Sequence, residues 1–217
     1  MNRERLVTGE HYHIYNRGVD KRFIFSDTKD VERFMLSMRV FNSVEPVLSI
    51  RDVLEIKEKV KRLPARKALV EFVAYCLNPN HYHFILRQLV DGGIAEFMKR
   101  LNGGYTWYFN KKNTRNGALL QGVYKSSLIS DNDKLLELSA YVNLNNRVHK
   151  IHGDSAKLVR SSWDEYVNSR SGFCKKGIIT NQFKSIKEYH KYAMNLLPLL
   201  QERKADEKEL KKLLLDV

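Results

Sequence analysis

The sequence predicts an α+β sandwich in which helices pack on a central antiparallel sheet. Segments with strand and helix patterns follow one another in the order strand, helix, strand, strand, helix, helix, which is typical of this class. Two of the strands are neighbours in the chain and are separated only by a short turn, so they are expected to form an antiparallel hairpin. The pattern changes near Gly172, after which helical segments dominate.

The first third of the chain supplies one strand and one helix. Residues 12–15 predict a short strand. Residues 27–40 predict a helix, because apolar side chains recur there at roughly helical spacing, namely Val31, Phe34, Met35, Met38 and Val40. The stretch 45–66 is interpreted as an insertion, and its polar run 56–62 is typical of a solvated helix or of inserted chain.

The middle of the chain contains the predicted hairpin. Residues 69–77 form a dense run of β-branched and aromatic side chains, which predicts a central strand. Asn78-Pro79-Asn80 is a turn, and 81–87 is the returning strand. A further helix is expected over 94–110, although Gly103-Gly104 weakens it.

The last part of the chain is expected to be helical, with helices over 183–200 and 206–217. The latter is charged and rich in leucine. These patterns divide the chain into one α+β domain over 1–170 and a helical C-terminal extension over 171–217.

Charge is the strongest signal in the composition. Lys and Arg number 38 against 25 Asp and Glu, a net charge of +13, which favours a polyanionic partner such as nucleic acid. The segment 96–125 interleaves cations with aromatic rings, a composition suited to single strands. Its aromatic side chains also fit an amphipathic helix that buries them in a core. The cations are Lys99, Arg100, Lys111, Lys112, Arg115 and Lys125, and the rings are Tyr105, Trp107, Tyr108, Phe109 and Tyr124.

Other features of the composition indicate a cytoplasmic protein. No run of eighteen apolar residues exists, and no apolar signal region follows the N-terminus. Cys76 and Cys174 lie far apart, so they form neither a metal-ligand spacing nor a disulfide framework.

His81-Tyr82-His83 lies on the second hairpin strand. Alternation along a strand places His81 and His83 on one face and Tyr82 on the other, which faces the core. Two neutral imidazoles on one rigid face can bind a divalent metal such as Mg²⁺ or Mn²⁺, although two unrelated strand histidines would show the same pattern. His11-Tyr12-His13 repeats the motif but lacks a preceding apolar strand, so His81 and His83 are preferred.

A helix over 131–145, capped by Ser130 or Asp131, presents a candidate nucleophile. Tyr141 and Asn145 are four residues apart, so they share a helix face and offer a phenol beside an amide oxygen. A surface tyrosine with a polar neighbour explains the same spacing.

Six segments lie in order along residues 10 to 168. They are Tyr12-His13-Ile14-Tyr15-Asn16-Arg17-Gly18, Asn78-Pro79-Asn80-His81-Tyr82-His83-Phe84-Ile85-Leu86, Leu101-Asn102-Gly103-Gly104-Tyr105-Thr106-Trp107-Tyr108-Phe109-Asn110, Gln121-Gly122-Val123-Tyr124-Lys125-Ser126, Tyr141-Val142-Asn143-Leu144-Asn145 and Ser162-Trp163-Asp164-Glu165-Tyr166. Together they resemble the HUH-type single-tyrosine transposases, which include small insertion-sequence transposases and REP-associated tyrosine transposases. Asn145-Asn146-Arg147 departs from the Asn-Pro-Val that is common in that family.

The resemblance implies a ferredoxin-like sandwich that cleaves and rejoins single-stranded DNA, folded as a hairpin, through a 5′-phosphotyrosine intermediate. It implies Tyr141 as the nucleophile, His81, His83 and Asn145 as ligands of Mg²⁺ or Mn²⁺, and the His11-Tyr12-His13 pair as a strand segment outside the metal site. The expected DNA contacts are Arg17, Lys99, Arg100, Lys111, Lys112, Arg115 and Lys125, with Tyr105 and Tyr108 as base-stacking residues and as alternative nucleophiles.

Several alternatives stay open at the level of sequence. A non-catalytic nucleic-acid-binding protein could keep the same scaffold, and replication-initiating or relaxase-type nucleases share the histidine pair. The chain could act as a monomer or as a homodimer, with Tyr141 serving its own subunit or the partner. Arg17 could form a salt bridge in place of a DNA contact.

Overall fold

The computed structural model describes residues 5–47, 50, 66–168 and 172–213, with side chains described up to residue 206. Its elements follow one another as β1 His11–Arg17, η1 Val19–Lys21, α1 Thr28–Val40, β2 Val70–Asn78, β3 His81–Gln88, α3 Gly93–Lys112, β4 Lys125–Leu128, α4 Asn132–Asn143, α5 Asn145–Val148, η2 Gly153–Leu158, β5 Arg160–Ser161, α6 Trp163–Val167, α7 Gly177–Thr180 and α8 Ile186–Leu213.

The strands form one antiparallel sheet in the order β4-β1-β3-β2-β5. The first four strands and the helices α1 and α3 follow the β-α-β-β-α-β order of a ferredoxin-like sandwich. The predicted α+β fold class is therefore confirmed, and so is the hairpin of β2 and β3, in which Asn78 pairs with His81 across the turn.

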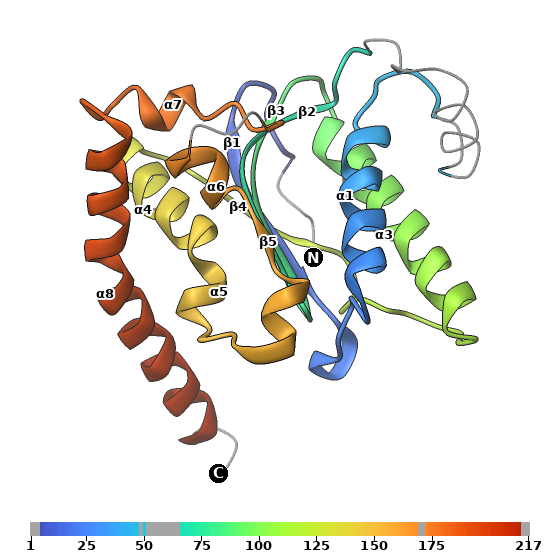
Figure 1. Ribbon diagram of the computed structural model, residues 1–217. Coiled ribbons are helices and arrows are strands. Elements are labelled where there is room, and N and C mark those ends of the chain that lie inside the picture. Colours follow the sequence, from blue (N-terminus) through green and yellow to red (C-terminus); the bar gives the residue numbers. More distant parts are fainter. Residues whose placement is uncertain (1–4, 48–49, 51–65, 169–171, 214–217) are drawn as a thin grey trace.

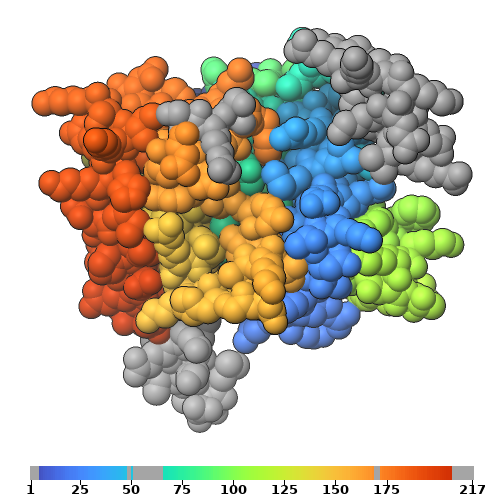
Figure 2. Space-filling model, in the orientation of Figure 1, coloured from blue at the N-terminus to red at the C-terminus, as the bar shows by residue number. Residues whose placement is uncertain are grey.

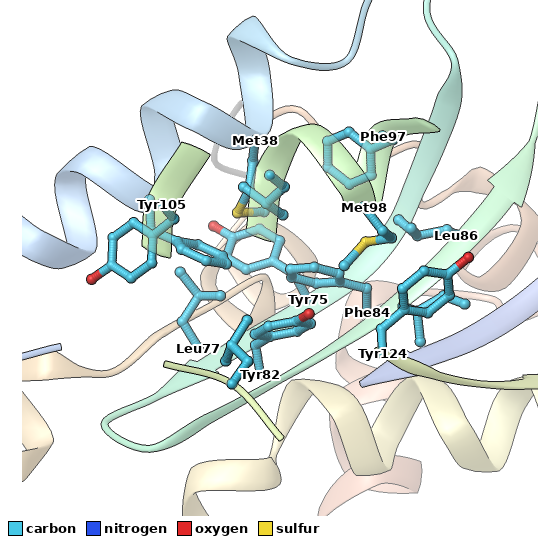
Figure 3. Close-up of a cluster of buried hydrophobic side chains, with 14 of the residues drawn as sticks. Met38, Tyr75, Leu77, Tyr82, Phe84, Leu86, Phe97, Met98, Tyr105 and Tyr124 are labelled. Carbon is cyan, nitrogen blue, oxygen red and sulfur yellow. The ribbon is translucent and has the colours of Figure 1, made fainter. Parts of the chain in front are cut away.

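Helices cover both faces of the sheet (Figure 1). On one face, α1 and α3 enclose a core that contains Tyr82, Phe84 and Leu86 of β3, seen among their neighbours in Figure 3. On the other face, the helices from α4 onward enclose a second core, which receives Ile85 of β3. Because both faces are covered, β2 and β3 are buried along most of their length.

Local signals place the helix ends. Asp27 and Asp131 cap α1 and α4, since their side chains accept hydrogen bonds from the backbone amides of Asp30 and Lys134. Helix α3 continues through the glycine pair that was expected to weaken it. The glycine at 104 is required by close packing, because a Cβ there would lie 2.8 Å from the Phe41 ring.

Three expectations about secondary structure were wrong. Strands β4 and β5 had not been predicted, because β4 is polar and largely exposed and β5 has two residues. Helix α4 ends at Asn143, and Asn145 begins the separate short helix α5. The two helices predicted after residue 183 are one helix, α8, because the residues between them favour a helix and Pro198 does not interrupt it.

The C-terminal helix packs on the domain beside α4 and α5. In the space-filling view it forms one flank of the molecule, next to the yellow and orange surface of those helices (Figure 2). The insertion expected over 45–66, with its polar helix at 56–62, lies largely outside the described residues. Cys76 and Cys174 are both free thiols. Within the described ranges, no helix has the length and apolarity needed to cross a bilayer.

Candidate active site

The two neighbouring strands β1 and β3 bring their polar side chains to one face of the sheet. In the antiparallel register, Arg17 lies opposite His81 and Tyr15 lies opposite His83. Directly opposed residues point to the same face, so His13, Tyr15 and Arg17 share the face of the histidine pair. The predicted alternation of β3 is thus confirmed, with Tyr82 in the opposite core.

A cavity of about 460 Å³ opens on this face of the sheet. Among the described residues that line it, the charged side chains are all cations, and none is Asp or Glu. Such a surface attracts a phosphate group. The lining residues are His13, Tyr15, Asn16, Arg17, His81, His83, Gln121, Lys125, Ser127, Tyr141, His149 and Lys204.

His81 is held with one ring nitrogen turned toward Asn145. Its Nδ1 lies 2.5 Å from Oδ1 of Asn80 and donates to it, because an amide oxygen can only accept. The Nε2 lone pair therefore faces Oδ1 of Asn145 at 3.0 Å. The amide nitrogen of Asn78 donates to both acceptors, over 2.9 Å to His81 and 2.6 Å to Asn145.

His83 lies in a stack of nearly parallel rings. Its Nδ1 is 2.9 Å from Nε2 of His13. The His13 and Tyr15 ring centroids lie 5.1 and 5.5 Å from that of His83, with interplanar angles of 15° and 16°. As expected, the first histidine pair is a strand segment, yet the strand brings His13 into direct contact with His83.

Tyr141 approaches the same face from helix α4. Its ring stands edge-on to His83, with centroids 5.5 Å apart, and edge-on to His13 at 6.2 Å. The expected sharing of one helix face by Tyr141 and Asn145 was wrong in detail, since the helix breaks at Leu144. Asn145 is fully buried rather than on an exposed face, and both residues still reach the site.

Buried hydrogen bonds fix the end of α4 that carries Tyr141. The Tyr189 hydroxyl on α8 accepts from the amide of Asn143 at 2.9 Å and lies 3.2 Å from the Ser139 hydroxyl. Asn143 in turn accepts from the Ser162 hydroxyl at 2.6 Å. The C-terminal helix is thus part of the scaffold of the site.

Burial keeps the imidazoles of the site neutral. Loss of hydration lowers the pKa of His13 to about 4 and, with the nearby His149, that of His81 to about 3. The pKa of His83 is also well below its usual value, first through burial and then through the adjacent His13. Neutral imidazoles keep a lone pair, which is the form that binds a metal.

The spacing of His81 and Asn145 fits a divalent metal. Adjacent ligands of an octahedral ion with bonds of about 2.1 Å lie about 3.0 Å apart. That value matches the separation of His81 Nε2 and Asn145 Oδ1. Asn145 Nδ2 is buried and has no hydrogen-bond partner among the described residues. Within the described part of the chain, three or more His, Cys, Asp or Glu side chains do not form a metal-binding group.

Two of the expected DNA contacts line the cavity. Arg17 and Lys125 are both in its wall. The Nε of Arg17 is buried and has no hydrogen-bond partner among the described residues. Lys99, Lys111 and Arg115 lie on or just after α3, in the layer across the sheet from the cavity.

Other expected contacts are engaged within the protein. The Tyr105 ring is buried in the core and its hydroxyl donates to the Ile24 carbonyl, so the expectation that it stacks on a base was wrong. The Tyr108 hydroxyl donates to Asp30, and Lys112 pairs with the same carboxylate. Arg100 and Lys99 both pair with Glu96, and Arg115 donates to the Asn110 side chain and to the Ala118 carbonyl. None of these side chains lines the cavity that contains the histidine pair.

His149 and Lys204 line the cavity and were not identified from the sequence. The His149 ring lies 4.6 Å from that of His81, and Lys204 reaches the cavity from α8. The spacing of Tyr141, Asn145 and His149, four residues apart in each step, was a signal for His149. Nothing in the sequence pattern indicates that α8 passes this cavity.

Comparison with known proteins bears on these residues. The family described as "Transposase IS200 like" matches residues 38–145, about half of the chain. That range includes His81, His83, Tyr141 and Asn145. No curated protein matches the sequence.

Two solved structures are distantly similar. A REP-associated tyrosine transposase bound to a REP hairpin is 12% identical, over 77% of this chain and 85% of that one, with a TM-score of 0.44. The tRNA(His) guanylyltransferase of Saccharomyces cerevisiae is 9% identical, over 89% of this chain and 74% of that one, with a TM-score of 0.32. Similarity at this level carries no conclusion about function. The family match and the motifs that it contains agree, and the chain belongs to the IS200-like, HUH-type family of single-tyrosine transposases.

Proposed function

We propose that this transposase cleaves and rejoins single-stranded DNA with Tyr141 as its nucleophile and a divalent metal held by His81, His83 and Asn145. The observation that carries the proposal is the approach of Tyr141 to the histidine pair, with its ring 5.5 Å from that of His83. The described residues that line their shared cavity include cations and no Asp or Glu, so the cavity suits a phosphodiester.

The proposed reaction is a transesterification. The Tyr141 oxygen attacks phosphorus and forms a 5′-phosphotyrosine bond, while the bond to O3′ breaks and O3′ leaves as a hydroxyl with a proton. In the reverse sense, a 3′-hydroxyl attacks the same phosphorus, rejoins the DNA and restores the phenol. Bond energy is conserved in the phosphotyrosine, so ATP is not required.

The metal ligands and the cations of the cavity have separate roles in this reaction. When bound, Mg²⁺ or Mn²⁺ would polarise a non-bridging phosphate oxygen. Arg17, Lys125 and Lys204 would neutralise the phosphates on either side of the reacting bond. The unpartnered Nε of Arg17 leaves a donor available for such an oxygen.

The substrate is proposed to be hairpin DNA with a single-stranded flank. The motif resemblance to REP-associated tyrosine transposases favours a hairpin. Lys99, Lys111 and Arg115 would contact its backbone. The ring contact between Tyr141 and His83 of the same chain supports a site that needs one chain only. This favours a tyrosine that serves its own subunit, without need of a homodimer.

Covalent capture tests the nucleophile. The protein is incubated with a labelled hairpin oligonucleotide in Mg²⁺ or Mn²⁺, and the adduct is resolved on a denaturing gel. Tyr141→Phe should abolish the adduct and leave oligonucleotide binding intact. Tyr15→Phe is the matched control, because Tyr15 lines the same cavity and its loss should leave an adduct.

Two results would contradict the proposal. An adduct that persists in Tyr141→Phe would assign the nucleophile to another residue, with Tyr105 and Tyr108 to be examined next. Tight oligonucleotide binding by the unaltered protein, with no adduct in either metal, would indicate a binding protein that has lost catalysis.

A further inference from the structure

We propose that His13 is a positioning residue that fixes the tautomer and the ring orientation of His83, so that His83 presents Nε2 to the metal. This inference rests on the proposed metal site and adds a residue that lies outside it. His13 reaches His83 from the neighbouring strand β1, 70 residues earlier in the chain, and its Nε2 lies 2.9 Å from Nδ1 of His83.

The position of one proton determines whether His83 can bind a metal through Nε2. A neutral imidazole carries a proton on one ring nitrogen and a lone pair on the other. The contact between His13 Nε2 and His83 Nδ1 is a hydrogen bond, so one of these two nitrogens carries the proton and the other accepts it. If His83 donates, its Nε2 has the lone pair and can bind a metal. If His13 donates, His83 Nε2 carries a proton and cannot.

The arrangement around His81 indicates which of the two occurs. His81 Nδ1 donates to the side-chain oxygen of Asn80 at 2.5 Å, which leaves Nε2 for coordination. Metal-ligating histidines generally donate their second nitrogen to such a partner, which fixes the ring and raises its basicity. His13 is the corresponding partner of His83, so each proposed ligand has its own acceptor.

The stacked rings restrict rotation of the His83 ring. The His13 and Tyr15 rings are nearly parallel to it, at 15° and 16°. Stacking alone allows a half-turn of the ring about its Cβ–Cγ bond, which would put Cδ2 in the place of Nδ1 and Cε1 in the place of Nε2. The hydrogen bond to His13 favours one of these orientations, so the two contacts together specify the direction of Nε2.

A neutral acceptor suits this particular cavity. Its charged lining residues include Arg17, Lys125 and Lys204, which would attract the DNA phosphate. A carboxylate in the position of His13 would orient His83 equally well, but its negative charge would repel the phosphate. An imidazole supplies the acceptor without that charge.

The experiment measures Mn²⁺ affinity without DNA, by titration calorimetry and by the electron paramagnetic resonance of free Mn²⁺. His13→Phe keeps an aromatic ring but removes the acceptor, and we expect a loss of about 10–100-fold in affinity, as for other partners of metal ligands. His13→Gln keeps an acceptor near the same place and should recover most of that loss. His11→Phe is the matched control, because His11 lies on the same face of β1 but opposite Arg87, and it should bind Mn²⁺ like the unaltered protein.

A second measurement needs no substitution. Two-bond correlation spectra of the ¹⁵N-labelled, metal-free protein identify the tautomer of each histidine, and we expect His83 to carry its proton on Nδ1. A proton on Nε2 of His83 would overturn the inference. So would unchanged Mn²⁺ affinity in folded His13→Phe.

A different result would contradict the proposed metal site itself. His81→Ala and His83→Ala are measured in the same titrations. If they bind Mn²⁺ like the unaltered protein, the metal site itself is wrong. If these two variants lose Mn²⁺ affinity while His13→Phe keeps it, the proposed metal site is supported and only the proposed role of His13 is wrong.

Discussion

The hydroxyl of Tyr189 on α8 accepts a hydrogen bond of 2.9 Å from the side-chain amide of Asn143 on α4. Both side chains are fully buried, and Asn143 is two residues from Tyr141. The C-terminal helix therefore holds the end of the helix that carries the proposed nucleophile. Asn143 also accepts from Ser162, so the network extends to the segment that joins β5 and α6.

Tyr189→Phe should destabilise the protein by about 1–3 kcal/mol, because it leaves a buried donor of Asn143 without an acceptor. Urea unfolding monitored by circular dichroism measures this loss. Tyr192→Phe is the control on the same helix, since Tyr192 is partly exposed and packs at the margin of this core. Equal stability of the two variants would show that the Asn143 contact contributes nothing.

Lys111 and Lys112 are adjacent cations with different surroundings. Lys112 lies 2.6 Å from the buried carboxylate of Asp30 and 2.8 Å from Asp27. Lys112→Ala should therefore lower stability by about 1–3 kcal/mol, since it removes a partner of a buried charge. The prediction is checked by thermal unfolding, in which Lys111→Ala should behave like the unaltered protein.

In a binding assay, Lys111→Ala should have the larger effect and Lys112→Ala the smaller one. Lys111 is exposed, so its loss should weaken oligonucleotide binding and reduce the slope of log affinity against log salt by about 0.7, the value for one phosphate of a single strand. Lys112→Ala should leave this slope unchanged. A change in salt slope that is larger for Lys112→Ala than for Lys111→Ala would indicate that Lys112 contacts the DNA.

Much of the central fold could be predicted because the relevant signals are local. The strand β2 is apolar on both faces and is followed by a turn, so the hairpin with β3 could be read from the sequence. Strand β4 has no alternation of apolar and polar side chains, because it is an exposed edge strand held by backbone bonds to β1.

The site was predicted in part for the same reason. His81, His83 and Tyr141 stand in local motifs, whereas the contact between His13 and His83 depends on β1 and β3 being neighbours in the sheet. The composition of 96–125 placed Tyr105 and Tyr108 in a segment rich in cations, but it did not show which side of α3 faces the core. The burial of Tyr105 depends on the packing of α3 against α1 and the sheet.

Lys204 connects the C-terminal helix to the proposed substrate. It lines both the cavity with the histidine pair and a second cavity between α4 and α8, and Tyr141 borders both. Lys204→Gln should weaken oligonucleotide binding and lower the salt slope by about 0.7, because one phosphate contact is lost. Lys191, an exposed cation on the same helix, is the matched control. An identical salt slope in Lys204→Gln and the unaltered protein would exclude a phosphate contact.

The buried imidazoles should make stability depend on pH. The folded-state pKa is about 4 for His13 and about 3 for His81, both below the usual 6.5, because burial disfavours the charged ring. Below pH 6.5 the unfolded chain therefore binds protons that the folded chain does not. This contribution to stability is complete above pH 6.5 and is lost as the pH falls toward 4 and below, by at most about 1.4 kcal/mol per pH unit for each imidazole.

Urea unfolding in a chelator between pH 7.5 and 5.0 checks this direction. The free energy of unfolding should fall as the pH is lowered, and His13→Gln should reduce the slope because one buried imidazole is gone. His152→Gln, which removes an exposed imidazole, should keep the slope of the unaltered protein. A free energy of unfolding that stays constant or rises as the pH is lowered from 7.5 to 5.0 would show that the imidazoles do not stay neutral in the folded chain. The argument that they are available as metal ligands would then be wrong.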